Sequence, residues 1–154
     1  HMTLVNNGIK CSCGHNGCWE SYASVTALIR QTKEAMEQNP ESLMHQIADK
    51  EGKVSGRTAF EAAKAGDEAG KEVVKNYVQY VAEGIVSLEN IFQPNIISVG
   101  GGISKEGEYL MKPVREYVQK NAYNKYMPHT KIVTAKLFND AGIIGAAMNA
   151  KNRL

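Results

Sequence analysis

The feature that most constrains the fold is a change in the spacing of apolar residues around Pro94. From about 67 to 92 they recur every three or four positions, which predicts a long helix largely buried along one side. The run that follows, NIISVGGGIS, is short, rich in β-branched residues and interrupted by three glycines, as is typical of a buried strand and a tight turn. A buried helix leading into a buried strand indicates the α/β class.

Further helices and one more strand complete the predicted pattern. Helices are expected over about 18–38, 41–52, 56–66 and 107–122, a strand in TKIVTAKL, and a last helix capped by Asn139 or Asp140. Pro113 falls early in its helix, where its missing N–H does least harm. The order helix, strand, helix, strand, helix predicts parallel strands joined by right-handed crossovers. Because a parallel sheet normally has more than two strands, we interpret the chain as part of a larger domain whose other strands precede residue 1.

The composition argues against two classes of partner. The 154 residues suffice for one domain with a sizeable core. The formal net charge is only +2, whereas a protein that binds nucleic acid usually has a clearly basic face. No apolar run approaches the roughly 20 residues of a membrane span. We therefore expect a soluble protein with neither nucleic acid nor a membrane as its partner.

All three cysteines of the chain lie in the short stretch CSCGHNGCWE, as Cys11, Cys13 and Cys18. One local disulfide with a spare thiol is the simplest interpretation. The spacing C-x-C-x4-C in a glycine-rich turn favours metal ligation instead, with reduced thiols in a cytoplasmic setting. A structural zinc site needs a fourth ligand, for which the candidates are His15 and His1. Spacing favours His15, although a ligand inside so short a loop would strain it.

The same stretch closely resembles the C-x-C-G-x-x-G-C-x-E signature of the ROK family, which includes bacterial glucokinases, other sugar kinases and sugar-responsive repressors. The runs AFEAAKAGD, PNIISVGGGIS and IVTAKLFNDAGIIGAAMNA extend the resemblance over nearly the whole chain. It implies a fold that is part of an actin-like ATPase (ribonuclease H-like) domain. Residues 1–154 would form the C-terminal part of the larger domain, without the N-terminal domain and the first strands.

The resemblance also implies a structural Zn²⁺ bound by His1, Cys11, Cys13 and Cys18, because the family's fourth ligand is a histidine ten residues before the first cysteine. Four protein ligands leave no open position for water, so such a site would pin the loop 1–20 rather than catalyse. The alternative is that the initial His-Met pair is a cloning remnant.

The resemblance also assigns roles in sugar and nucleotide binding. Glu20, which by itself suits the first turn of a helix, would accept hydrogen bonds from sugar hydroxyls, and His1 would also face the sugar. The glycines Gly100, Gly101 and Gly102 allow close approach of the backbone to a ligand and would line the adenosine of ATP. We expect Ser104 to cap the following helix rather than to bind nucleotide.

The function implied for the intact protein is that of a cytoplasmic, homodimeric glucokinase, which transfers a phosphoryl group from ATP, with Mg²⁺, to the 6-hydroxyl of glucose. No residue here matches the family's phosphate loop or catalytic aspartate, so we expect this chain alone to be inactive. Alternatives are a sugar-responsive ROK repressor, a kinase for fructose or an N-acetylated sugar, and a free-standing zinc-bound interaction module. The strand at about 96–99 would have an unpaired edge, which we expect to pair with the remaining N-terminal portion or a second chain.

Overall fold

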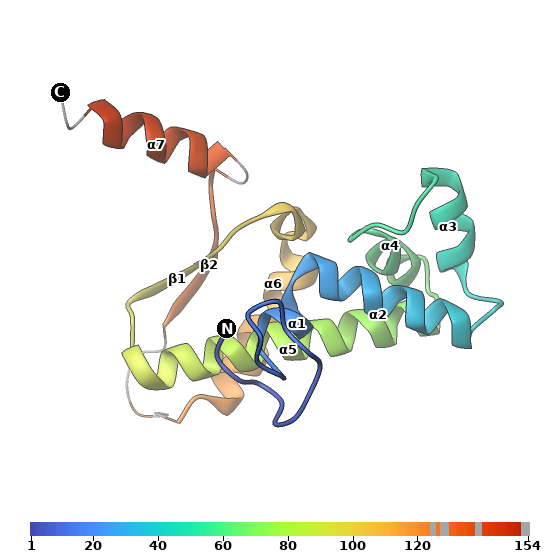
Figure 1. Cartoon of the computed structure of the whole chain (residues 1–154), viewed down its shortest axis with the longest axis horizontal. Helices are drawn as coiled ribbons and strands as arrows, with labels where there is room; N and C mark the ends of the chain where they lie inside the picture. Colours follow the sequence, from blue (N-terminus) through green and yellow to red (C-terminus); the bar gives the residue numbers. More distant parts are fainter. Residues whose placement is uncertain (124–125, 127–129, 138–139, 152–154) are drawn as a thin grey trace.

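The computed structural model describes residues 1–123, 126, 130–137 and 140–151 (Figure 1). The helices are α1 (Glu20–Ala23), α2 (Val25–Gln38), α3 (Leu43–Glu51), α4 (Thr58–Lys64), α5 (Glu68–Phe92), α6 (Glu108–Asn121) and α7 (Ala141–Lys151). A 3₁₀ helix, η1 (Gly102–Glu106), and the strands β1 (Ile96–Val99) and β2 (Lys131–Thr134) complete the described elements. The predicted helix-rich α/β fold is confirmed.

Helix α5 is the axis around which α1, α2, α4 and α6 pack, as Figure 1 shows. Its N-cap is Asp67, whose carboxylate accepts a hydrogen bond from the Gly70 N–H, and its C-cap is Gln93, just before Pro94. Its apolar face forms the core with residues of α2, α4 and α6. The largest fully buried side chains include Tyr77, Phe60, Leu28, Met44, Leu110 and Met111. The long buried helix expected from the apolar spacing is therefore confirmed.

Strands β1 and β2 pair in parallel, with Ile96 opposite Lys131 and Val99 opposite Thr134. The predicted parallel arrangement is confirmed. One face of this small sheet packs on the core through Ile97 and Ile132. Beyond the sheet, α7 projects away from the rest of the molecule (red in Figure 1), and every one of its described residues is exposed. None of the helices in the described ranges is long and apolar enough to cross a membrane.

Three local expectations need correction or completion. The helix expected over 18–38 is broken at Ser24, whose backbone is extended and whose hydroxyl accepts a hydrogen bond from the Ala27 N–H, so that it caps α2. Pro113 lies in the second turn of α6, beyond the N–H groups that a helix start leaves unpaired. The cap expected from Asn139 lies outside the described residues.

Candidate metal centre

The first nineteen residues form a loop, the metal loop, that folds back on itself. Thr3 and Cys18 pair as an antiparallel bridge, which brings the start of the chain beside the last cysteine. Gly17 makes this possible, because its φ of 76° suits glycine and a Cβ there would overlap the carbonyl of Val5. The loop therefore has a defined path although it contains no regular secondary structure.

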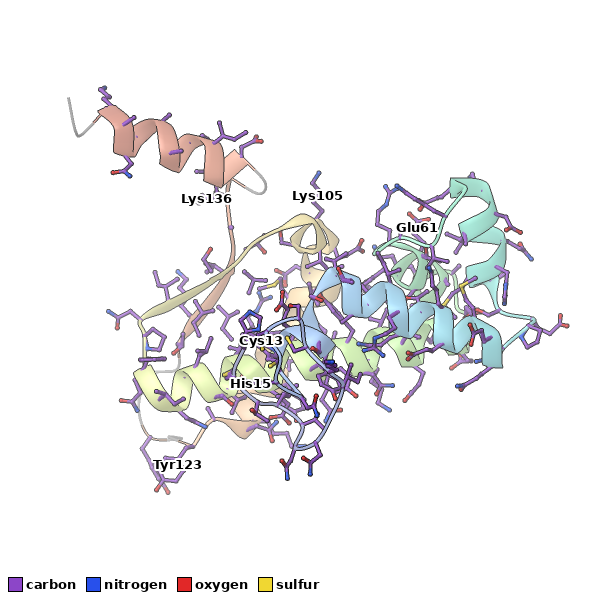
Figure 2. The ribbon with its side chains drawn as sticks, in the orientation of Figure 1. Cys13, His15, Glu61, Lys105, Tyr123 and Lys136 are labelled. Atoms are coloured by element: carbon purple, nitrogen blue, oxygen red, sulfur yellow. The ribbon has the colours of Figure 1, made fainter. Side chains whose placement is uncertain are left out.

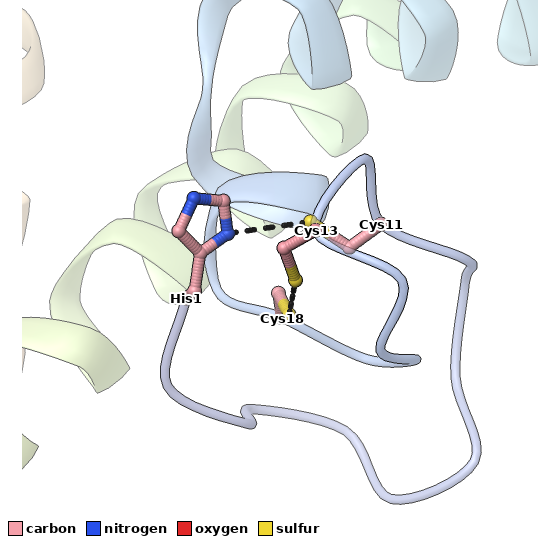
Figure 3. Close-up of side chains that lie close together, drawn as sticks. All are labelled: His1, Cys11, Cys13 and Cys18. Carbon is pink, nitrogen blue, oxygen red and sulfur yellow. Dashed lines mark hydrogen bonds between the residues drawn. The ribbon is translucent and has the colours of Figure 1, made fainter.

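This path gathers the four predicted ligands (Figure 3). His1 Nδ1 lies 3.4 Å from Cys11 Sγ, Cys13 Sγ lies 3.5 Å from Cys18 Sγ, and all four ligand atoms are within 4.8 Å of one another. In a tetrahedral zinc site with Zn–S bonds of about 2.3 Å, neighbouring sulfurs are about 3.8 Å apart. All three cysteines are free thiols, so the local disulfide is not formed. The donor set and its spacing fit one Zn²⁺.

His15, the alternative fourth ligand, is not a member of this cluster. Its backbone carbonyl accepts a hydrogen bond of 2.8 Å from the Cys11 N–H, which closes the turn between the first and the last cysteine. His15 thus contributes to the loop through its backbone. Its exposed side chain is labelled in Figure 2.

The thiols of the cluster differ in their electrostatic surroundings. A hydrogen bond from the backbone N–H of Cys13 lowers the pKa of Cys11 to about 6. Burial raises the pKa of Cys18 to about 11, and the neighbouring thiols act in the same direction. Since a metal ligand must be a thiolate, Cys18 needs a nearby positive charge to ionise at neutral pH. A divalent cation at the centre of the cluster would supply that charge.

Glu20 lies beside the cluster, in the first turn of α1. Its Oε2 is 3.3 Å from His1 Nδ1, and both side chains are about half exposed. Nδ1 has only one lone pair, so a metal ion bound there would replace the contact between Nδ1 and Glu20. The carboxylate would then be left next to the metal loop with its oxygens available as hydrogen-bond acceptors.

The glycine turn at the end of β1 forms a second candidate ligand surface. Gly101 has a φ of 84°, and no described atom lies within 4 Å of a Cβ built on Gly101 or Gly102. Ser104, which is buried, donates a hydrogen bond of 2.7 Å to the Gly101 carbonyl and stabilises the turn. The expectation that Ser104 caps the next helix is wrong, because the residue that precedes α6 is Gly107. Gly100 sits against Ala135, on the segment after β2.

Sequence reasoning missed the residues that hold α1 in place. Three of its four carbonyls accept hydrogen bonds from side chains of other helices: Ser21 O from Arg30, Tyr22 O from Gln31, and Ala23 O from Tyr77, at 2.9 to 3.0 Å. In the sequence these donors fit the ordinary pattern of α2 and α5, so no local signal distinguishes them. Their role depends on the break at Ser24, which was not expected.

A family model described as "ROK family" matches residues 1–153. The chain belongs to the ROK family. It is 34% identical, over its full length, to the glucokinase of Thermotoga maritima, of which it covers 49%. It is 28% identical to the xylose repressor of Bacillus spizizenii, with 94% of this chain and 34% of the repressor matched.

Among solved structures, a ROK family glucokinase from Streptomyces griseus in complex with glucose and AMPPNP superposes with a TM-score of 0.89 at 32% identity. The match covers 99% of this chain and 50% of that protein. The present chain thus spans about half the length of its ROK glucokinase relatives. The expected fold, part of an actin-like ATPase domain, is confirmed by this neighbour.

Proposed function

We propose that the chain is the C-terminal portion of an ATP-dependent glucokinase, which transfers a phosphoryl group from ATP to the 6-hydroxyl of glucose. The observation that carries the proposal is the convergence of the cysteine cluster, His1 and Glu20 at one place, with Glu20 Oε2 3.3 Å from His1 Nδ1. Its support comes from glucokinase relatives of 32 to 34% identity and from the relative solved with glucose and AMPPNP.

In this proposal Zn²⁺ is bound by His1, Cys11, Cys13 and Cys18 and has a structural role. It fixes the loop that carries the sugar-binding side chains. Glu20 accepts hydrogen bonds from vicinal hydroxyls of the sugar, a task for which a carboxylate is well suited because charged acceptors form the stronger hydrogen bonds. The ring of His1 contacts the sugar from the same side.

The nucleotide site in this proposal includes the turn Gly100–Gly102, whose open backbone lines the adenosine of ATP, with Mg²⁺ on the phosphates. The catalytic base and the phosphate loop belong to the remaining portion of the protein. Asp67 is no substitute, because its carboxylate is occupied by the N–H groups of Leu43 and Gly70. That remaining portion pairs with the outer edge of β1, and the intact enzyme is a cytoplasmic homodimer.

The test is a coupled assay on the full-length gene product with a panel of hexoses. We expect glucose to be phosphorylated with a higher kcat/KM than fructose or N-acetylglucosamine, and the protein to contain one zinc per chain. The 154-residue chain alone should show no activity. Absence of hexose phosphorylation by the full-length protein would refute the proposal.

A ROK repressor is the second candidate, favoured by the 28% identity to a xylose repressor over 94% of this chain. The two functions make opposite predictions in one experiment. A repressor binds operator DNA, releases it when sugar is added and phosphorylates nothing. A kinase consumes ATP in the presence of glucose and shows no sugar-dependent DNA binding.

A further inference from the structure

We propose that Trp19 and Gly84 form an interlocking contact that positions Glu20 for sugar binding. In this contact, called the Trp19–Gly84 lock, the indole of Trp19 occupies the space left by the absent side chain of Gly84 on α5. Trp19 and Gly84 are positioning residues and touch neither substrate nor metal. The inference rests on the proposed function, because it concerns how the sugar-binding side chain is held.

The first observation is the fit of the indole on α5. A Cβ built on Gly84 would overlap Trp19 Cε2, Cδ2 and Cζ2, so no other residue is compatible with this position of the ring. Trp19 Nε1 donates a hydrogen bond of 2.7 Å to the carbonyl of Tyr80, one helical turn earlier. Glycine in the middle of a helix is unfavourable relative to alanine. The contact with Trp19 accounts for a glycine at this buried position of a 25-residue helix.

The second observation is that α1 has no independent stability. A helix of four residues lies far below the length at which isolated helices form in water. Its position is instead set by hydrogen bonds from α2 and α5, which satisfy the carbonyls of Ser21, Tyr22 and Ala23. The Trp19–Gly84 lock fixes the other end of this segment, immediately before Glu20.

The third observation is that Trp19 also holds the start of the chain. Its backbone N–H donates a hydrogen bond of 2.8 Å to the carbonyl of Met2, the neighbour of His1. A shift of Trp19 would therefore move His1 and Glu20 together relative to α5. Since hydrogen bonds to sugar hydroxyls are directional, a displacement of this kind weakens binding without removing either side chain.

The decisive variant is Gly84→Ala in the full-length protein, because the added methyl group displaces the indole. We expect the KM for glucose to rise between about tenfold and a hundredfold, with kcat within about twofold of wild type. Trp19→Phe keeps a ring but loses the hydrogen bond to Tyr80, and its KM should rise by less. In the double variant Gly84→Ala/Trp19→Leu the smaller leucine side chain makes room for the methyl group. The rise of KM in the double variant should therefore be smaller than the product of the rises in Gly84→Ala and in Trp19→Leu alone.

The matched control is Gly70→Ala on the same helix. A Cβ at Gly70 would lie 2.9 Å from Ala62 Cβ and Ala63 N, against α4 and away from the metal loop. This variant should lower thermal stability and leave the KM for glucose unchanged. An equal rise of KM in Gly70→Ala and Gly84→Ala would mean that KM responds only to loss of stability. That result would refute the positioning role of the Trp19–Gly84 lock.

A readout that needs no sugar separates this inference from the proposed function. The protein is labelled with 5-fluorotryptophan, and the ¹⁹F signal of Trp19 is assigned by its loss in Trp19→Phe. Gly84→Ala should shift this signal while zinc content stays at one per chain. If wild type neither binds nor phosphorylates a hexose, the proposed function fails although the signal shifts. If glucose is phosphorylated but Gly84→Ala leaves the signal or the KM unchanged, the lock is refuted and the function stands.

Discussion

The metal loop and the β1–β2–α7 region differ in how fully they are packed against the rest of this chain. The metal loop has partners for its backbone within the chain, and the helix that follows it, α1, is held by side chains of α2 and α5. In the second region the small sheet packs on the core by one face, and α7 is exposed along its whole described length. A helix as apolar as GIIGAAM normally has a covering partner. The metal loop thus finds its contacts within this chain, whereas α7 has a solvent-exposed surface that we propose is covered in the intact protein.

The largest effect is expected from breaking the metal loop at Cys18. Cys18→Ser replaces the fully buried thiol of the cluster, and a serine hydroxyl does not replace a thiolate as a zinc ligand. We expect loss of the bound zinc and of glucose phosphorylation, measured by elemental analysis and the coupled assay on the full-length protein. His15→Ala is the control, and it should retain zinc. Stoichiometric zinc in Cys18→Ser would show that the cluster is not the metal site.

The second test leaves the metal loop intact and removes one charge beside it. Glu20→Gln keeps the size of the side chain but weakens the acceptor, and a hydrogen bond to a charged group contributes about 1.5–3 kcal/mol. The KM for glucose should therefore rise between about tenfold and a hundredfold. Glu72→Gln, at an exposed position of α5, should leave KM unchanged. An unaltered KM in Glu20→Gln would remove Glu20 from the sugar site.

The third test concerns Asp67, whose carboxylate accepts hydrogen bonds from the first turns of both α3 and α5. Burial by itself would raise the pKa of Asp67, but hydrogen bonds from the Gly70 and Leu43 N–H groups outweigh it and hold the pKa below 3.8. A depressed pKa means that ionised Asp67 stabilises the fold above its unfolded-state pKa, and that this stability is lost as pH falls through the folded-state pKa. The acid-sensitive window thus lies below about pH 4.

Asp67→Asn replaces one acceptor oxygen by an NH₂ group, so the hydrogen bond from either Gly70 N–H or Leu43 N–H is lost, and the free energy of unfolding at pH 7 should fall by about 1–2 kcal/mol. The difference from wild type should shrink below about pH 4, as measured by urea unfolding at a series of pH values. Asp49→Asn, at an exposed position of α3, is the control and should leave the free energy of unfolding at pH 7 nearly unchanged. A difference that grows on acidification would contradict the assigned pKa shift.

The sequence predicted some parts of the molecule better than others. Apolar spacing was sufficient for α5 and α6, because each buries one continuous face, and the glycine run was sufficient to end β1. The break at Ser24 was not predictable, since Tyr22, Val25 and Leu28 recur every third residue across it. The hydrogen bond from Trp19 to Tyr80 joins residues 61 positions apart, and no local pattern reports such a contact. That His1 lies with the three cysteines was predictable only from the family signature, because spacing alone favoured His15 as the fourth member of the cluster.

The smallest effect in this chain is expected in α7, and it tests the incomplete region directly. Ile143 is 74% exposed, so Ile143→Ser should change the free energy of unfolding of the 154-residue chain by less than about 0.5 kcal/mol. Ile85→Ser is the matched control: its side chain is only 2% exposed, and the same replacement should cost several kcal/mol, about 2–5. In the full-length protein, where we propose that α7 is covered, Ile143→Ser should become destabilising by more than about 1 kcal/mol. Equal effects of Ile143→Ser in the two proteins would show that α7 stays uncovered in the full-length protein. The exposure of α7 would then be a property of the protein itself and would not result from a missing partner.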